Sequence, residues 1–277
     1  MNLLRFLPCV LLLAACSSAP PPAAPAGDGI KFTEDVVYGR ADGSALLADI
    51  AQPPGDGPFP AVVSVHGGRW VGGHKKDTSS IKPRDWAQLG FFAMTIDYRL
   101  AKATPAPACY QDMLCAIRYV RAHAAQYRVD PNRIFVIGQS AGGHMASLLA
   151  TLGEGPYKKT GGWNDQSAEI RGVISVCAPY ELNTLDWGKL WVPIGADETA
   201  ARREASPIVH VKAGNKPILI LHSDDDKSVP IKQAVDMAEA LQKAGARHKF
   251  LHYTDKGHMQ IVDYVVRESV AFIKANE

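Results

Sequence analysis

The feature that most constrains the fold is the alternation of short apolar runs with stretches of helical periodicity. Continuous apolar runs are typical of parallel strands that are buried on both faces. We expect strands at residues 61–65, 91–97, 133–137, 172–177, 217–222 and 248–253. Amphipathic helices are expected at residues 111–127, 141–152, 231–244 and 260–274. This order of elements predicts an α/β chain with a mostly parallel, doubly wound sheet.

A hairpin is expected before these elements. The runs 35–39 and 46–51 are separated by Asp42 and Gly43, a pair favoured in tight turns. They predict an antiparallel pair at one sheet edge. The irregular stretches 153–168 and 182–215 follow strands, and loops beyond the carboxyl ends of strands carry the ligand in open α/β sheets.

The N-terminal segment is expected to direct export. One positive residue, Arg5, precedes a short apolar run and then small residues up to Cys16, so residues 1–15 are interpreted as a signal peptide. Residues 13–16 read Leu-Ala-Ala-Cys and resemble the lipobox of bacterial lipoproteins. The resemblance implies lipidation of Cys16 and a membrane-anchored protein facing the periplasm or cell surface. The alternative is an ordinary cut near Ala15, which leaves a soluble periplasmic protein.

The remaining chain divides into a tether and one folded domain. Residues 16–29 are rich in Pro and Ala and predict a disordered spacer, which leaves residues 30–277 as the domain. The net charge of +2 and the absence of a basic block give no indication of nucleic-acid binding. Three cysteines belong to the domain, and whether they form a disulfide stays open: Cys109, Cys115 and Cys177.

The sharpest motif is the G-x-S-x-G sequence of residues 138–142, centred on Ser140. It directly follows an expected strand and directly precedes an expected helix. A nucleophile elbow needs small residues on both sides of its serine, because the strand-to-helix turn is tight and strained. The motif in this context predicts that Ser140 is a catalytic nucleophile.

A serine nucleophile needs a base and an acid, which follow it in the order acid, then histidine. His258 lies between the last expected strand and the last expected helix, at the same sheet edge as Ser140, and is the candidate base. The candidate acids follow the strand at 217–222, and the pattern does not choose among them: Asp224, Asp225 and Asp226.

Glycines after the strand at 61–65 predict an oxyanion-binding loop. Backbone N–H groups of Gly68 or Arg69, together with that of Ala141, are the expected donors to a developing oxyanion. His66 is interpreted as a structural residue that holds this loop. Candidate substrate-lining residues are four tryptophans in loops: Trp70, Trp163, Trp187 and Trp191. No metal or organic cofactor is implied.

With these residues in view, the chain resembles the feruloyl-esterase-like and acetylxylan-esterase-like (BD-FAE-type) carboxylesterase branch of the α/β-hydrolase superfamily, related to hormone-sensitive-lipase-like esterases. The resemblance rests on residues 49–53, 66–70, 97–100, 130–134, 138–144 and 222–230. It implies an α/β-hydrolase fold without a large cap domain, and it selects Asp226 as the acid. The chain departs from the family pattern at Ser223 and Arg69, where glycines are common.

The expected function is therefore ester hydrolysis by Ser140, His258 and Asp226, with small-molecule or polysaccharide esters as substrates. Removal of acetyl or feruloyl groups from polysaccharide follows from the family resemblance and the expected location. Two alternatives remain at this stage. One is a prolyl-oligopeptidase-like peptidase or amidase, and the other is a non-catalytic lipoprotein that uses the fold for binding.

Overall fold

The computed structural model describes residues 29–187 and 191–277. The expected signal peptide, Cys16 and all but the last residue of the expected tether lie outside the described residues. In the part that is described, no helix is both long and apolar enough to cross a bilayer.

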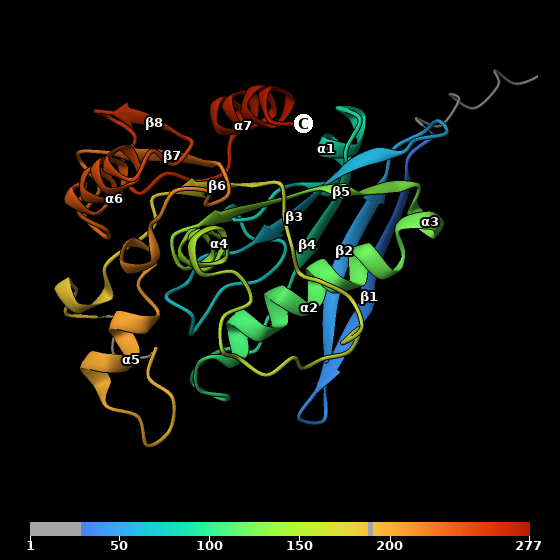
Figure 1. The fold of residues 1–277 in the computed structure, drawn as a ribbon. Helices are drawn as coiled ribbons and strands as arrows, with labels where there is room; N and C mark the ends of the chain where they lie inside the picture. The colour runs from blue at the N-terminus through green and yellow to red at the C-terminus, as the bar shows by residue number, and fades with distance from the viewer. Residues whose placement is uncertain (1–28, 188–190) are drawn as a thin grey trace, which may run out of the picture.

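An eight-stranded sheet forms the centre of the molecule (Figure 1). The strands lie in the order β1-β2-β4-β3-β5-β6-β7-β8. Their bounds are β1 Lys31–Ala41, β2 Ser44–Gln52, β3 Phe59–Val65, β4 Phe92–Ile96, β5 Val129–Gln139, β6 Gly172–Val176, β7 Ile218–Ser223 and β8 His248–Tyr253. From β4 to β8 every neighbouring pair is parallel.

The antiparallel part lies at one edge, as the sequence predicts. β1 pairs with β2 through the turn at Asp42 and Gly43, and β2 also pairs antiparallel with β4. In the central strands Val63 of β3 lies opposite Met94 on one side and Val136 on the other. The expected α/β sheet with an N-terminal edge hairpin is confirmed.

Helices cover both faces of the sheet. Their bounds are α1 Pro83–Gln88, α2 Ala108–Ala122, α3 Ala124–Tyr127, α4 Ala141–Leu152, α5 Glu198–Glu204, α6 Lys232–Lys243 and α7 Asp263–Ala275, with short 3-10 turns at Leu182–Thr184 and Pro207–His210. Figure 1 shows α1 and α7 above the sheet and α2, α3, α4 and α6 below it.

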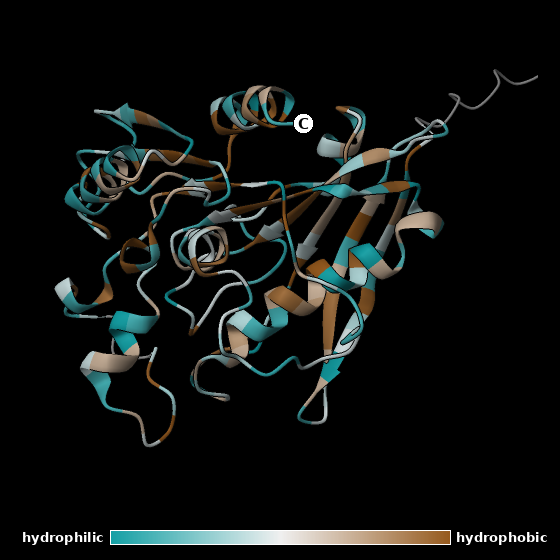
Figure 2. Ribbon diagram, viewed as in Figure 1, coloured by the Kyte–Doolittle hydropathy of each residue, from teal (hydrophilic) through white to brown (hydrophobic). Residues whose placement is uncertain are grey.

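Side chains in β5 alternate between these two layers. Val136 joins the core shared with α2, α4 and α6, whereas Phe135 and Ile137 join the core shared with α1 and α7. Burial on both faces explains why the strands read as unbroken apolar runs, and Figure 2 shows the hydrophobic colouring concentrated there. Each large apolar side chain buried in this way stabilises the fold by about 1.5–3 kcal/mol.

Two expected helices differ from those observed. The stretch 111–127 forms two helices, because α2 ends at Ala122. The next residue, His123, separates α2 from α3, and its ring contacts the Tyr119 carbonyl oxygen at 2.8 Å. The last helix begins at Asp263 rather than residue 260, since the Ile261 N–H donates to the Thr78 carbonyl. Between β6 and β7 the described residues hold only α5 and the two 3-10 turns.

Candidate active site

Ser140 sits at the turn between β5 and α4, as the G-x-S-x-G motif predicts. It takes a left-handed conformation with φ 52°, which is rare for a residue with a side chain. Its N–H donates to the Val176 carbonyl of β6 at 2.8 Å, so a neighbouring strand holds the turn in place. Strain of this kind at the end of a central strand is typical of a functional serine.

The glycines around Ser140 are required by close backbone contacts. A Cβ at Gly138 would collide with the backbone of Gly142, and a Cβ at Gly142 would collide with the carbonyl oxygen of Val65 in β3. The sharp turn therefore exists only because these positions lack side chains.

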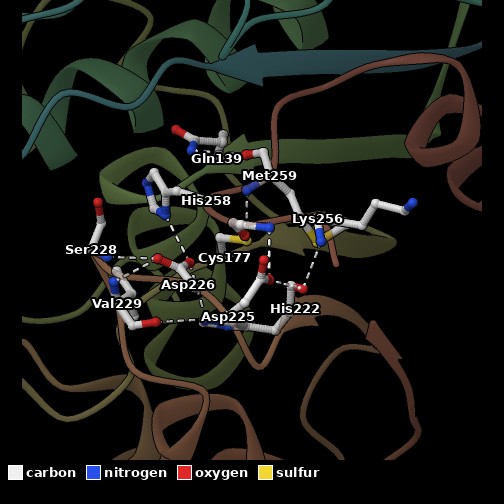
Figure 3. A network of polar contacts seen from close by, with 12 residues as sticks. Gln139, Cys177, His222, Asp225, Asp226, Ser228, Val229, Lys256, His258 and Met259 are labelled. Atoms are coloured by element: carbon white, nitrogen blue, oxygen red, sulfur yellow. Dashed lines mark hydrogen bonds and ion pairs between the residues drawn. The ribbon is translucent and has the colours of Figure 1, made fainter. Parts of the chain in front are cut away.

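The imidazole of His258 lies on the loop between β8 and α7. Its Nδ1 is 2.8 Å from Oδ2 of Asp226, which lies on the loop after β7 (Figure 3). A carboxylate accepts, so this contact assigns the hydrogen to Nδ1 and leaves Nε2 as the basic nitrogen. The ring is one-quarter exposed and Asp226 is buried, an arrangement suited to a base oriented by an acid.

Asp226 is held ionised by several donors. Its Oδ1 accepts from the N–H groups of Ser228 at 2.7 Å and Val229 at 3.0 Å, and Nε2 of His222 lies 3.3 Å from Oδ2. Burial raises the pKa of the Asp226 carboxyl, but hydrogen bonds from His222, His258 and the Val229 N–H outweigh burial and lower that pKa below its ordinary value.

The two neighbouring aspartates have different positions. Asp225 accepts from the Gly257 N–H at 2.8 Å and from the hydroxyl of Ser223, which lower its pKa. The Ser223 hydroxyl also accepts from the Lys256 N–H at 3.0 Å, so Ser223 supports the histidine loop. Asp224 lies outside this network, with its carboxylate 3.8 Å from the ring of exposed His252.

The expected oxyanion loop follows β3 and is tightly wound. Gly68, Arg69 and Trp70 all have positive φ, and the N–H of Val71 closes the turn on the Gly68 carbonyl. The N–H groups of Gly68 and Arg69 donate to no group in residues 29–187 or 191–277, and neither does that of Ala141. These three amides are thus available to an external acceptor.

His66 holds the base of the loop. Its buried ring stacks on Tyr98 with centroids 4.1 Å apart, and the Tyr98 hydroxyl contacts the carbonyl oxygens of His66 and Gly67. Burial lowers the pKa of His66, which keeps the ring neutral. The position of His66 agrees with a structural role.

A pocket of about 690 Å³ contains both Ser140 and His258. Its wall includes Gly68 and Arg69 from the oxyanion loop and Trp187 from the segment after β6. The structure therefore brings together, at one end of the parallel strands, residues that lie far apart in the sequence.

Three of the four candidate tryptophans lie away from this pocket. Trp70 and Trp191 are almost fully buried and pack edge-on against each other, 5.4 Å apart, beneath the loop. Trp163 contacts His123 and donates its Nε1–H to the Tyr38 carbonyl on the other side of the molecule. The expectation that they line the pocket is corrected, because the loops fold their rings into the core or onto α2. Only Trp187 is in the pocket wall.

Two supporting residues carry no recognisable sequence signal. Gln139 donates through Nε2 to the Met259 carbonyl at 3.0 Å and so ties the elbow to the histidine loop. Cys177, with φ 49°, accepts from the Met259 N–H through its sulfur at 3.3 Å (Figure 3). These contacts fix the loop that carries His258.

The three domain cysteines are free thiols in the structure, so no disulfide links them. Among the described residues, donor atoms of Cys177, His222 and Asp226 lie within 4.8 Å of one another, a grouping able to hold a metal ion. Asp226 already accepts from His258 and two backbone N–H groups, so hydrogen bonding accounts for this grouping.

Several solved structures with the same fold are esterases. A truncated carbohydrate esterase from gut microbiota superposes with a TM-score of 0.75 at 25% identity, over 91% of this chain and 98% of that one. Thermogutta terrifontis esterase 2, phosphonylated by cyclosarin, gives a TM-score of 0.74 at 26% identity, over 93% of this chain and 97% of that one.

Several relatives found by sequence are named as esterases as well. The probable carboxylic ester hydrolase LipM of Mycobacterium tuberculosis is 27% identical, over 76% of this chain and 51% of its own length. The probable isoprenylcysteine alpha-carbonyl methylesterase ICMEL1 of Arabidopsis thaliana is 29% identical, over 82% of this chain and 50% of its own length. The chain spans about half the length of these relatives. The BD-FAE family model matches residues 48–241, and the chain belongs to the BD-FAE family of α/β-hydrolases.

Proposed function

We propose that the protein is a carboxylic ester hydrolase that works through a covalent acyl-enzyme on Ser140. The observation that carries the proposal is the contact between His258 and Asp226 at the pocket that contains Ser140. The family and the esterase relatives support the same reaction class.

In the first half-reaction Nε2 of His258 takes the proton from the Ser140 hydroxyl as Oγ attacks the ester carbonyl. The tetrahedral intermediate collapses to the acyl-serine, and the alcohol leaves with the proton from His258. Water then attacks the acyl-serine by the same route and releases the carboxylic acid. Throughout, Asp226 orients the imidazole and stabilises its positive charge.

The amides of Gly68, Arg69 and Ala141 are the proposed donors to the oxyanion. They have no hydrogen-bond partner among the residues that the structure describes, so they need not break a bond there before they bind the developing charge. One such donor is worth about 3 kcal/mol in the transition state, or roughly a hundredfold in rate.

The proposed activity is tested with p-nitrophenyl acetate and butyrate. The full chain and its Ser140→Ala and His258→Gln variants are compared at equal concentration. Turnover by the wild type that disappears in both variants supports the triad. Equal residual rates in all three proteins would favour the non-catalytic binding role, and turnover of peptide amides but not esters would favour a peptidase.

For the physiological substrate we propose acetyl or feruloyl esters on polysaccharide. One structural neighbour is described as a carbohydrate esterase, and an exported protein would meet such polymers. Decorated xylan is the test substrate, with acetate and ferulate measured separately. Turnover of p-nitrophenyl esters without release of either acid would refute this substrate while leaving ester hydrolysis intact.

Export with lipidation at Cys16 is a separate proposal, which rests on the sequence of residues 1–16. Radioactive palmitate fed to bacteria expressing the full chain should label the wild type and leave Cys16→Ser unlabelled. Label in neither protein, with both recovered from the periplasm, would favour the ordinary signal peptide.

A further inference from the structure

Arg69 lies in the tightly wound oxyanion loop, between Gly68 and Trp70, and also in the wall of the pocket. Its positive φ of 53° matches the conformation that glycine adopts most readily, so a side chain here carries a conformational cost. The loop accepts that cost while placing a guanidinium in the wall of the pocket with Ser140. We therefore expect the Arg69 side chain to have a function inside the pocket.

Trp187 holds the guanidinium in place. The Arg69 Cζ lies 5.0 Å from the centre of the Trp187 ring, within the range of a cation–π contact. Trp187 in turn packs against buried Trp70, with ring centres 5.9 Å apart. A cation supported in this way loses little conformational freedom when it binds a ligand.

No carboxylate neutralises Arg69 within residues 29–187 and 191–277. The other cation of the pocket wall, Lys76, does have a partner, because its Nζ is 2.7 Å from Glu34. The wall also contains Asp77, for which the described part of the chain offers no ion-pair partner. Beside the catalytic groups, the pocket therefore presents one unpaired cation and one unpaired anion.

We propose that the preferred substrates are esters that carry a carboxylate near the scissile bond, and that Arg69 binds this carboxylate. The planar guanidinium can form two parallel hydrogen bonds to one carboxylate, a stronger and more directional contact than a neutral polar group can make. The inference rests on the proposed ester hydrolysis at Ser140 and narrows its substrates: among acyl esters of polysaccharide, it selects those in which a sugar carboxylate lies near the scissile bond.

The test compares matched anionic and neutral esters. On the alcohol side the pair is para-acetoxybenzoate and para-acetoxybenzamide, and on the acyl side it is monomethyl terephthalate and methyl para-carbamoylbenzoate. Within a pair a carboxylate replaces a carboxamide of similar shape. Each kcat/KM is divided by the rate constant of imidazole-catalysed hydrolysis of the same ester, so that the ratio of the two normalised values measures recognition of the carboxylate. The backbone N–H of Arg69 serves both esters equally and cancels from the ratio.

We expect the wild type to favour the anionic ester in at least one pair by about fivefold or more, the range of a partly exposed ion pair. Arg69→Gln should bring the ratio close to one, and Arg69→Lys should retain part of the preference. Asp77→Asn should raise the ratio, because it removes a charge that repels the substrate carboxylate. Arg40→Gln, an exposed arginine outside the pocket, is the matched control.

The outcomes separate the inference from the proposed function. A ratio near one in both pairs, or a preference unchanged in Arg69→Gln, would overturn carboxylate recognition while ester hydrolysis stands. Absence of turnover on every ester would instead contradict the proposed function. Loss of the preference in Arg40→Gln as well would assign the effect to overall charge and also overturn the role of Arg69.

Discussion

The Nδ1 atom of His258 lies 2.8 Å from Oδ2 of Asp226, while the carboxylate of the adjacent Asp225 accepts from the Gly257 N–H at 2.8 Å. Two consecutive acids thus have separate tasks: one orients the imidazole, and the other holds the loop that carries it. Asp224 has neither contact. This division leads to the first prediction.

Asp226→Asn should lower kcat on p-nitrophenyl acetate by about 10³–10⁴, because the amide favours the wrong histidine tautomer and provides no charge for the imidazolium. Asp224→Asn is the matched control and should stay within about twofold of the wild type, since the exposed Asp224 carboxylate lies beside His252 and not in the contact with His258. Similar losses in both variants would contradict the assignment of Asp226 as the acid.

The contact between the elbow and β3 predicts a difference between two glycines. Gly142→Ala should destabilise the fold by about 1–3 kcal/mol, because its methyl group meets the Val65 carbonyl. At Gly72 a Cβ would meet nothing closer than the Gly68 carbonyl oxygen at 4.0 Å, and Gly72→Ala should be nearly neutral. Urea unfolding monitored by tryptophan fluorescence compares the stabilities of the two variants. Equal stabilities would contradict the prediction, because they would show that the elbow backbone shifts to accommodate a methyl group at residue 142.

His144 predicts a loss of stability at mildly acidic pH. The ring is fully buried between Trp70 and Trp191, and its Nε2–H donates to the Ala205 carbonyl at 2.7 Å. Burial lowers the pKa of His144 to about 4, against about 6.5 in the unfolded chain. The unfolded state therefore binds a proton more readily than the folded state. The stability that depends on a neutral His144 is complete above pH 6.5 and is lost as the pH falls to 4.

The contribution of His144 between pH 7 and pH 4.5 should be about 2 kcal/mol of unfolding free energy. In His144→Phe this part of the pH dependence should disappear, whatever the absolute stability of the variant. His248→Gln, at the start of the edge strand β8, should retain the wild-type dependence. If the unfolding free energy falls equally with pH in the wild type and in His144→Phe, other groups cause the acid sensitivity.

The sheet could be predicted from the sequence because its physical cause is local. Strands such as β3 and β6 are covered on both faces, so every residue in them is apolar or small and the run is easily recognised. The elbow at Ser140 was predictable because its motif is local: Gly138 is required by the backbone of Gly142, although Gly142 is also required by the Val65 carbonyl of the distant strand β3. Helix α5 was not expected, because residues 198–204 are mostly polar and lie inside an irregular stretch.

The finer parts of the site depend on contacts between distant segments. The choice of Asp226 over Asp225 rested on the family resemblance, because adjacent loop residues point in different directions that spacing does not reveal. The prediction that Trp70 and Trp191 line the pocket was wrong, because the neighbouring segments that cover a loop decide whether its tryptophans pack into the core or face solvent. Cys177 accepts from the Met259 N–H and so supports the His258 loop, although the two residues are 82 positions apart. No local sequence pattern predicts such a contact.

Covalent labelling of the nucleophile tests the central claim most directly. The full chain is treated with a fluorophosphonate, and the adduct is located by mass spectrometry of proteolytic peptides while residual p-nitrophenyl acetate turnover is measured. The account predicts one adduct per chain, on Ser140, with loss of activity in proportion to labelling and no adduct in Ser140→Ala. Stoichiometric labelling of another residue, or full turnover by Ser140→Ala, would contradict it.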